Sequence, residues 1–158
     1  MSKNSGEGML DTINSQAKIA SMLSLIFKEM IQQKAQDRND ALMVLKAAVQ
    51  DNDFLLGIWT VWEKDMFDGK DSQYVNKPGH DATGRFVPYY NKAGGALSLE
   101  ACMDYDVSEY YTLAKSSRKE VIMEPYYYSI NGRNMLLSTY TVPIIVDGRF
   151  LGAVGVDF

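Results

Sequence analysis

The fold is decided by residues 120–158, whose sequence is EVIMEPYYYSINGRNMLLSTYTVPIIVDGRFLGAVGVDF. Two short turn signals, Asn131-Gly132 and Asp147-Gly148, divide this stretch into three runs rich in β-branched and aromatic residues. Both residues of such a pair tolerate the positive φ angles that a tight hairpin turn requires. The stretch therefore predicts a meander of three consecutive antiparallel strands.

The N-terminal third of the chain has a helical pattern instead. From Met9 to about Gln36, apolar residues recur at steps of three and four, which predicts a helix about 40 Å long. Such a helix exceeds what a small domain needs, so we expect one end to pack on the body and the other to project. The remaining expected elements are a helix over 41–50, strands near 55–62, 85–90 and 96–100, a long polar loop over 64–84 and a short helix over 108–116.

These elements together predict an α+β fold. A long N-terminal helix packs on a five- or six-stranded antiparallel sheet, and short helices lie on one face. The length of 158 residues suits one domain. We expect a disordered lead-in over residues 1–8, a helical segment over 9–52 and the sheet-containing module over 53–158.

The composition excludes several classes of function. The net charge is −4, and no cluster of lysine and arginine replaces a basic surface, so we expect no nucleic-acid partner. The single cysteine permits no internal disulfide. No stretch reaches the roughly 20 apolar residues that span a bilayer, and the first residues lack the apolar core of a signal peptide. Any membrane anchor of a parent protein would lie outside this sequence.

Enzyme chemistry also finds little support. His80 and Cys102 are the only residues of their types, too few for a serine triad or a zinc site, and no phosphate-binding glycine loop is present. We therefore expect no metal and no cofactor. Asp104 and Asp106 form a carboxylate pair with three open interpretations: an acid and base, a cation site, or two solvated side chains. The ten tyrosines and two tryptophans favour a binder of small molecules, because aromatic side chains form rigid walls with polar tips.

Six runs in a fixed order carry a resemblance to a known family. They are GIWTVWEKDMFDGKD (57–71), HDATGRFVPYY (80–90), DYD (104–106), EPY (124–126), VPI (142–144) and GAVGVD (152–157). Over residues 9–158 the chain resembles the membrane-distal module of a double Cache domain. That module is the extracytoplasmic sensor of bacterial methyl-accepting chemotaxis proteins and of some sensor kinases.

The resemblance implies a PAS-like sheet on a long helix that rises from a transmembrane segment. It also implies a ligand pocket between the sheet and the loops that cover it. The parent protein would be a membrane-anchored chemoreceptor, with this domain in the periplasm and with a homodimer as its assembly. The domain would bind a small solute and signal through the long helix.

The family's amino-acid sensors carry an arginine just before an aromatic pair and an aspartate two residues after Pro-Tyr. Here Val87 and Tyr128 stand at those positions, which argues against an α-amino acid. The run Gly-Arg-Phe-Val-Pro-Tyr (84–89) resembles that of receptors for polyamines and other biogenic amines, and this resemblance implies an amine or polyamine as the ligand. Asp104 and Asp106 would accept the cation, while aromatic rings would add cation–π contacts. The predicted ligand-binding residues are Trp62, Arg85, Tyr89, Tyr90, Asp104, Asp106, Tyr126 and Tyr128.

Some nearby residues have an ordinary structural interpretation. We expect Trp59 in the core and Asp157 as a structural residue at the end of the last strand, and Arg85 is as well suited to a salt bridge near Asp81 or Asp104. Three alternatives to the amine receptor stay open. They are a sensor of another ligand such as an amino acid, organic acid or purine, the sensor of a histidine kinase, and a ligand-free dimerisation or spacer module.

Overall fold

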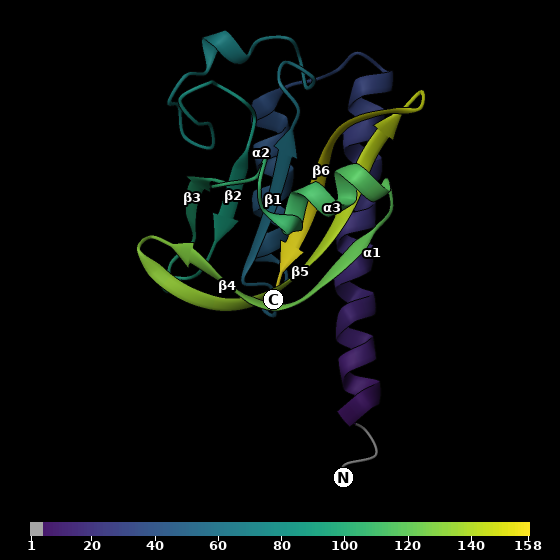
Figure 1. Cartoon of the computed structure of the whole chain (residues 1–158), viewed down its shortest axis with the longest axis vertical. Helices are drawn as coiled ribbons and strands as arrows, with labels where there is room; N and C mark the ends of the chain where they lie inside the picture. Colours follow the sequence, from purple (N-terminus) through teal and green to yellow (C-terminus); the bar gives the residue numbers. More distant parts are fainter. Residues whose placement is uncertain (1–4) are drawn as a thin grey trace.

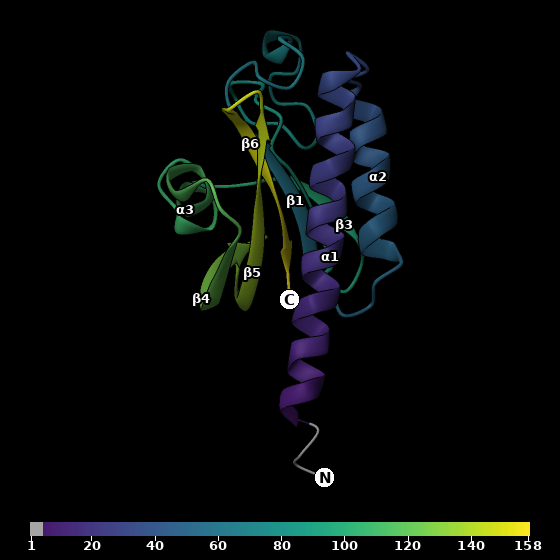
Figure 2. The same ribbon diagram turned by 90° about the vertical axis from the view of Figure 1, so that its right-hand side faces the viewer.

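The computed structural model describes residues 5–158, and side chains from Asp11 onward with the exception of residue 12. The chain forms three layers (Figures 1 and 2). Helices α1 (Ser5–Gln32) and α2 (Arg38–Gln50) cover one face of a six-stranded sheet, and helix α3 (Glu109–Ser117) lies on the opposite face. The predicted α+β class is confirmed, with the refinement that the helices cover both faces.

The sheet has the order β3-β2-β1-β6-β5-β4, and all neighbouring strands are antiparallel. A short 3-10 turn, η2 (Asp71–Gln73), lies in the long loop between β1 and β2. The strands are β1 (Gly57–Trp62), β2 (Pro88–Asn91), β3 (Ser98–Ala101), β4 (Val121–Ile130), β5 (Arg133–Val146) and β6 (Arg149–Asp157).

Both predicted hairpin turns are confirmed. Asn131 and Gly132 have φ angles of 52° and 75°, and Asp147 and Gly148 have φ angles of 52° and 76°. Two consecutive positive φ angles define the turn whose twist matches that of the flanking strands. The turns set the register of both hairpins, with Ile130 opposite Arg133 and Val146 opposite Arg149. The hairpins place β4, β5 and β6 side by side, and the pairing of β6 with β1 puts β6 at the centre of the sheet.

The long helix α1 begins at Ser5, before the expected start at Met9, so the expected lead-in over 1–8 lies partly outside the described residues. Its N-terminal part extends past the end of the sheet, as expected (Figure 2). Across residues 5–158, no helix has both the length and the hydropathy needed to cross a bilayer. Helix α2 begins after Asp37, whose carboxylate accepts a hydrogen bond from the backbone N–H of Asp40 at 3.1 Å.

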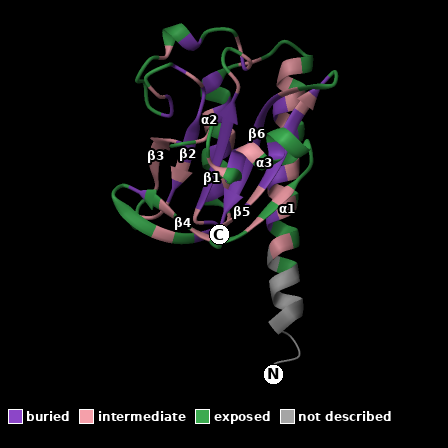
Figure 3. Ribbon diagram, viewed as in Figure 1, coloured by how far each residue is buried: buried purple, intermediate pink, exposed green. Residues whose placement is uncertain are grey.

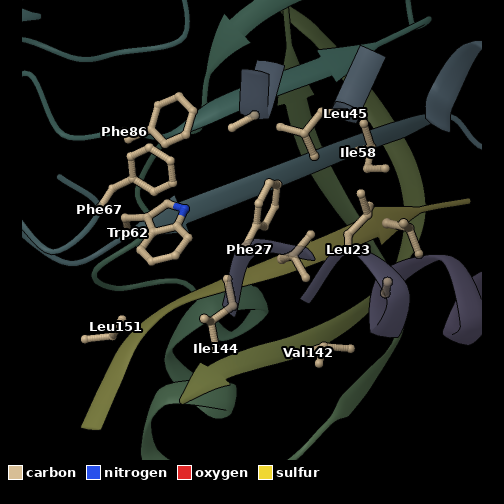
Figure 4. Close-up of a cluster of buried hydrophobic side chains, with 14 of the residues drawn as sticks. Leu23, Phe27, Leu45, Ile58, Trp62, Phe67, Phe86, Val142, Ile144 and Leu151 are labelled. Atoms are coloured by element: carbon tan, nitrogen blue, oxygen red, sulfur yellow. The ribbon is translucent and has the colours of Figure 1, made fainter. Parts of the chain in front are cut away.

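The layer between the sheet and α1 is an aromatic and aliphatic core (Figures 3 and 4). Trp62 lies between the rings of Phe27 and Phe67, with centroids 6.2 and 4.9 Å away, and all three side chains are almost completely buried. Leu23 and Leu45 come from the two helices, whereas Ile58, Val142 and Ile144 come from the sheet. This packing fixes the position of α1 against β5 and β6.

The long loop after β1 is held by a buried arginine. Arg38 forms ion pairs with Asp68 at 2.6 Å and Asp71 at 2.7 Å, and it donates to the carbonyl of Gly84 at 3.0 Å. Its guanidinium carbon lies 4.2 Å from the centroid of the Tyr74 ring. Because burial of a charge is tolerated only with such partners, the network makes this loop a fixed part of the helix-covered side.

Candidate functional site

The second face of the sheet carries a small, partly open space, here called the inner cavity. Its volume is about 10 Å³, room for about one water molecule. It lies under the loop that joins β3 to α3 and beside the strand β4. The lining residues are Trp59, Tyr89, Cys102, Tyr110, Tyr126, Tyr128 and Asp157.

Strand alternation and two glycines place the largest rings of this cavity. Trp59 points to the cavity face of β1, and its register partner on β6 is Gly155. A Cβ atom on Gly155 would lie 2.2 Å from carbon atoms of the indole, so only glycine lets the ring lie flat over β6. At Gly57, a Cβ would lie 2.6 Å from the ring of Tyr89. The two glycines thus provide the space that the aromatic wall occupies.

Asp157 supplies the carboxylate of the cavity. Tyr89 donates its hydroxyl to Oδ2 at 2.6 Å, and Thr139 donates to Oδ1 at 2.7 Å. The hydroxyl of Tyr126 lies 2.7 Å from that of Thr139 and extends this chain of hydrogen bonds. Complete burial raises the pKa of Asp157 to about 6, although the hydrogen bonds from its neighbours favour the ionised form. A buried carboxylate among aromatic rings is suited to a cation, which would restore the lost hydration energy.

The loop that covers the cavity is held in place by hydrogen bonds to the backbone of Met103. The hydroxyl of Tyr110, on α3, donates to the carbonyl of Met103 at 2.7 Å, and the N–H of Met103 donates to the hydroxyl of Tyr128 at 2.8 Å. Tyr128 also makes edge-to-face contacts with Tyr110 and Tyr89, with centroids 5.7 and 6.1 Å away. A ligand larger than one water therefore has to displace this cover.

The structure brings three predicted site residues together: Tyr89, Tyr126 and Tyr128 all line the inner cavity. Trp62 and Tyr90 lie on the opposite face, where both pack in the core below α1 and α2. Trp59, expected in the core, is buried in the second core cluster and also lines the cavity, whereas Trp62, predicted to bind ligand, belongs to the core below α1 and α2. All six residues of β1 are buried, so hydrophobicity alone could not tell the two faces apart.

Arg85 belongs to a salt-bridge network at the edge of the cover. It donates to the carboxylate of Asp106 at 3.0 Å and to that of Glu63 at 3.4 Å. Its guanidinium carbon lies 4.4 Å from the centroid of the Tyr105 ring. Glu63 in turn accepts hydrogen bonds from Lys115 at 2.6 Å and from Tyr111 at 2.5 Å. The expected alternative for Arg85, a bracing salt bridge, fits this geometry.

Asp104 and Asp106 are exposed and do not line the inner cavity. They border an open depression of about 490 Å³, here called the lateral hollow, together with Asp81 and Cys102. The two side chains leave the sheet where the chain turns, because Asp104 has a φ angle of 55° and ends the extended backbone after β3. The expected pairing of these acids with an aromatic cage is corrected: the carboxylate inside the cage is that of Asp157.

Sequence reasoning missed four cavity residues: Trp59, Cys102, Tyr110 and Asp157. A signal for two of them was present, since Gly155 and Asp157 share a face of β6, and Gly155 makes room for a ring across the strand. Burial raises the pKa of the Cys102 thiol well above its usual range, so this side chain lines the cavity as a neutral group. No sequence signal identified Tyr110 as a part of the cover.

Comparison with known proteins identifies the family of the chain. Residues 41–158 match the family described as "Methyl-accepting chemotaxis protein-like, first PDC sensor domain". The match covers more than half of the chain, which therefore belongs to this family of sensor domains. Among curated proteins, the methyl-accepting chemotaxis protein TlpQ of Pseudomonas aeruginosa is 27% identical over 135 residues, which cover 76% of this chain and 19% of that protein.

Solved structures share the whole architecture. The extracellular domain of the putative histidine kinase mmHK1S-Z3 is 39% identical, with a TM-score of 0.86 over 93% of this chain and 52% of that one. The structure called methyl-accepting chemotaxis protein X is 29% identical, with a TM-score of 0.83 over 96% of this chain and 57% of that one. The chain thus spans about half the length of these relatives. It is an extracytoplasmic sensor domain, a sensing module and not a catalytic one.

Proposed function

We propose that the chain is the membrane-distal ligand-binding module of a chemoreceptor and that it binds a small organic amine in the inner cavity. The carrying observation is Asp157, a completely buried carboxylate whose neighbours are aromatic rings and hydroxyl groups. An ammonium group would pair with this carboxylate and lie against the rings of Trp59 and Tyr126. Charge-assisted hydrogen bonds and cation–π contacts are both strengthened where water is excluded.

The lining also argues for an amine without a carboxylate. Within the described part of the chain, the inner cavity has no lysine or arginine among its lining residues. Arg85, the cation proposed from the sequence, is engaged by Glu63 and Asp106. Domains of the same fold were solved with isoleucine (Campylobacter jejuni Tlp3, 16% identical) and with asparagine (Mlp24, 22% identical). An amino acid here would bring a carboxylate that finds no opposite charge.

One observation favours a second candidate function. The inner cavity holds about one water, and its own tyrosines fill the remaining space. A module that never opens would be a spacer or a dimerisation unit, with α1 as its contact surface. We expect a homodimer in the full receptor under either function, and light scattering of the purified receptor measures it. The two functions differ in whether any small solute raises the stability of the domain.

Titration calorimetry with a primary monoamine and a neutral isostere of the same shape tests the amine proposal. We expect binding of the amine only, and a loss of about tenfold to a hundredfold in affinity for Asp157→Asn, the range for a charged hydrogen bond in a buried site. The exposed Asp53→Asn is the matched control and should bind like the natural domain. Equal affinity for the neutral isostere would remove the charge argument. A thermal-shift screen in which no amine, amino acid, organic acid or purine stabilises the domain would favour the spacer.

A further inference from the structure

His80, the only histidine of the chain, is buried in the long loop between β1 and β2. Its imidazole contacts two aromatic rings. The Tyr74 ring is stacked on it with a centroid distance of 4.9 Å, and the Phe86 ring lies 5.4 Å away. The backbone of His80 also forms an antiparallel bridge with that of Phe86. The imidazole is therefore part of the packing that gives this loop its shape.

The two nitrogen atoms of the imidazole have different environments. Nδ1 lies 2.9 Å from the backbone carbonyl oxygen of Pro78. Because a carbonyl oxygen only accepts hydrogen bonds, Nδ1 carries the proton and donates it. Nε2 is buried and has no hydrogen-bond partner among residues 5–158. The neutral ring leaves one acceptor unpaired, whereas a proton on Nε2 would add a buried charge and a donor without an acceptor, which costs more.

A second cation contacts the same two rings. The guanidinium carbon of Arg38, at the start of α2, lies 4.2 Å from the Tyr74 centroid and 5.3 Å from the Phe86 centroid. Burial lowers the pKa of His80 below its usual value, and the charge of Arg38 acts in the same direction. The hydrogen bond to the carbonyl of Pro78 opposes this lowering. The surroundings of the ring thus favour its neutral form.

The carboxylates of the same loop already have partners. Asp68 and Asp71 accept hydrogen bonds from Arg38 at 2.6 and 2.7 Å. Asp81 accepts from the hydroxyl of Tyr105. The charge of Asp71 favours a protonated imidazole, but less than the charge of Arg38 opposes it. A protonated imidazole could therefore bind one of these acids only by displacing its present partner.

The residues that follow His80 connect the helix-covered side of the sheet with the loop that covers the inner cavity. The carbonyl of Gly84 accepts a hydrogen bond from Arg38 of α2 at 3.0 Å. The next residue, Arg85, pairs at 3.0 Å with Asp106 of the covering loop. Two adjacent residues thus carry contacts to both sides, and a displacement of this segment would loosen both contacts together.

We propose that His80 makes the loop over residues 64–84 sensitive to acid. At neutral pH the uncharged imidazole packs against its two rings and holds the loop closed. Protonation at Nε2 moves the ring out of its site into water, which opens the loop and weakens the ion pair between Arg85 and Asp106. Acidification therefore shifts the domain toward a state with a loosened cover. This inference involves no ligand, so it stands or falls independently of the proposed amine function.

NMR titration of the natural domain gives the first test, because a single histidine leaves no ambiguity in assigning the imidazole signals. We expect the pKa of His80 to lie below about 6.5, the value of an exposed imidazole, and the nitrogen shifts to place the proton of the neutral ring on Nδ1. A pKa at or above about 6.5 would overturn the proposal, because the protonated ring would then be accommodated in the closed loop.

Amide hydrogen exchange measures the opening of the loop. We compare residues 64–84 between about pH 7 and 5, with each rate divided by the intrinsic rate at that pH. In the open loop the imidazole regains its usual pKa, so protection should fall as the pH drops below about 6.5, by up to about tenfold per pH unit, the limit for one proton. Residues 103–107 of the covering loop should lose protection over the same range.

The variant His80→Asn removes the titration and keeps a side-chain N–H that can donate to the carbonyl of Pro78. Its loop protection should not change with pH. Gln73→Asn, an exposed position of the same loop, is the matched control and should keep the acid response of the natural domain. An equal acid response in His80→Asn and in the natural domain would show that another group opens the loop.

Two further results decide the proposal even where His80→Asn does not fold. Loop protection that stays constant in the natural domain while its imidazole titrates would show that His80 only fills space. A loop that opens while residues 103–107 keep their protection would overturn the connection through Arg85 and leave only the local opening.

Discussion

The two faces of the sheet have opposite chemistry. The face below α1 and α2 is packed with aliphatic and aromatic side chains such as Phe27 and Trp62. The face below α3 holds tyrosines and a buried carboxylate, and their hydroxyls bond to one another and to the backbone. A close-packed apolar core resists small displacements, because they open voids or create clashes, whereas a hydrogen-bonded wall can exchange one set of partners for another. The first face is therefore suited to hold the helix, and the second to change when a ligand enters.

The largest effect on stability is expected from a substitution in the core below α1 and α2. Phe27→Ala removes a completely buried ring that contacts Trp62, and should cost about 3–5 kcal/mol of unfolding free energy. Urea denaturation measures this loss. Phe54→Ala, where the side chain is 47% exposed, is the control and should change stability by less than about 0.5 kcal/mol. Where Phe27→Ala still folds, its amine affinity should equal that of the natural domain. A large loss of affinity would show that the two faces are not separate.

A medium effect is expected at the glycine under Trp59. Gly155→Ala places a methyl group within 2.2 Å of the indole, so the ring must shift into the inner cavity. We expect a loss of about 1–3 kcal/mol in stability from overpacking, together with loss of ligand binding. Gly94→Ala, where an added methyl meets no atom within 4 Å, serves as the control for denaturation and calorimetry. Natural affinity in Gly155→Ala would contradict the assignment of Trp59 to the site.

The smallest expected effect on stability is that of pH. Its sign for the buried Asp157 is opposite to its sign for the carboxylates that pair with cations. The pKa of Asp157 is raised from 3.8 to about 6, so the stability that it contributes is complete below pH 3.8 and is lost as the pH rises through 6. The pKa values of Glu63 and Asp68 are lowered by their hydrogen-bonded cations, against the opposing effect of burial, so their contribution is lost as the pH falls. The difference between the natural domain and Asp157→Asn isolates the first effect.

We expect this difference in unfolding free energy to change by at most about 1.4 kcal/mol per pH unit, the limit for one proton, and only between about pH 4 and 6. Cation affinity should rise over the same window, because only the ionised Asp157 pairs with an ammonium group. Denaturation and calorimetry at several pH values measure the two effects. A parallel pH dependence in the natural domain and in Asp157→Asn would show that another group is responsible.

Most of the fold could be predicted from the sequence because its signals are local. The Asn131-Gly132 and Asp147-Gly148 turns fix the meander whatever surrounds them, and the spacing of apolar residues marks α1. The site could be predicted only in part. The resemblance pointed to Tyr89, Tyr126 and Tyr128, which line the inner cavity, but the face of Trp59 depends on strand parity in a segment that is buried on both sides. Asp157 was missed because its burial arises from neighbours on β2 and β5 that are distant in sequence.

The placement of the two tryptophans has a practical consequence for following the molecule in solution. They are the only indoles of the chain, they stand three residues apart on one strand, and they point into different layers. Replacing either one by phenylalanine leaves a single fluorophore that reports from one side of the sheet. The domain therefore contains two fluorescent probes. Comparing the emission of the two single-tryptophan variants distinguishes a change at the inner cavity from a change in the packing of the long helix.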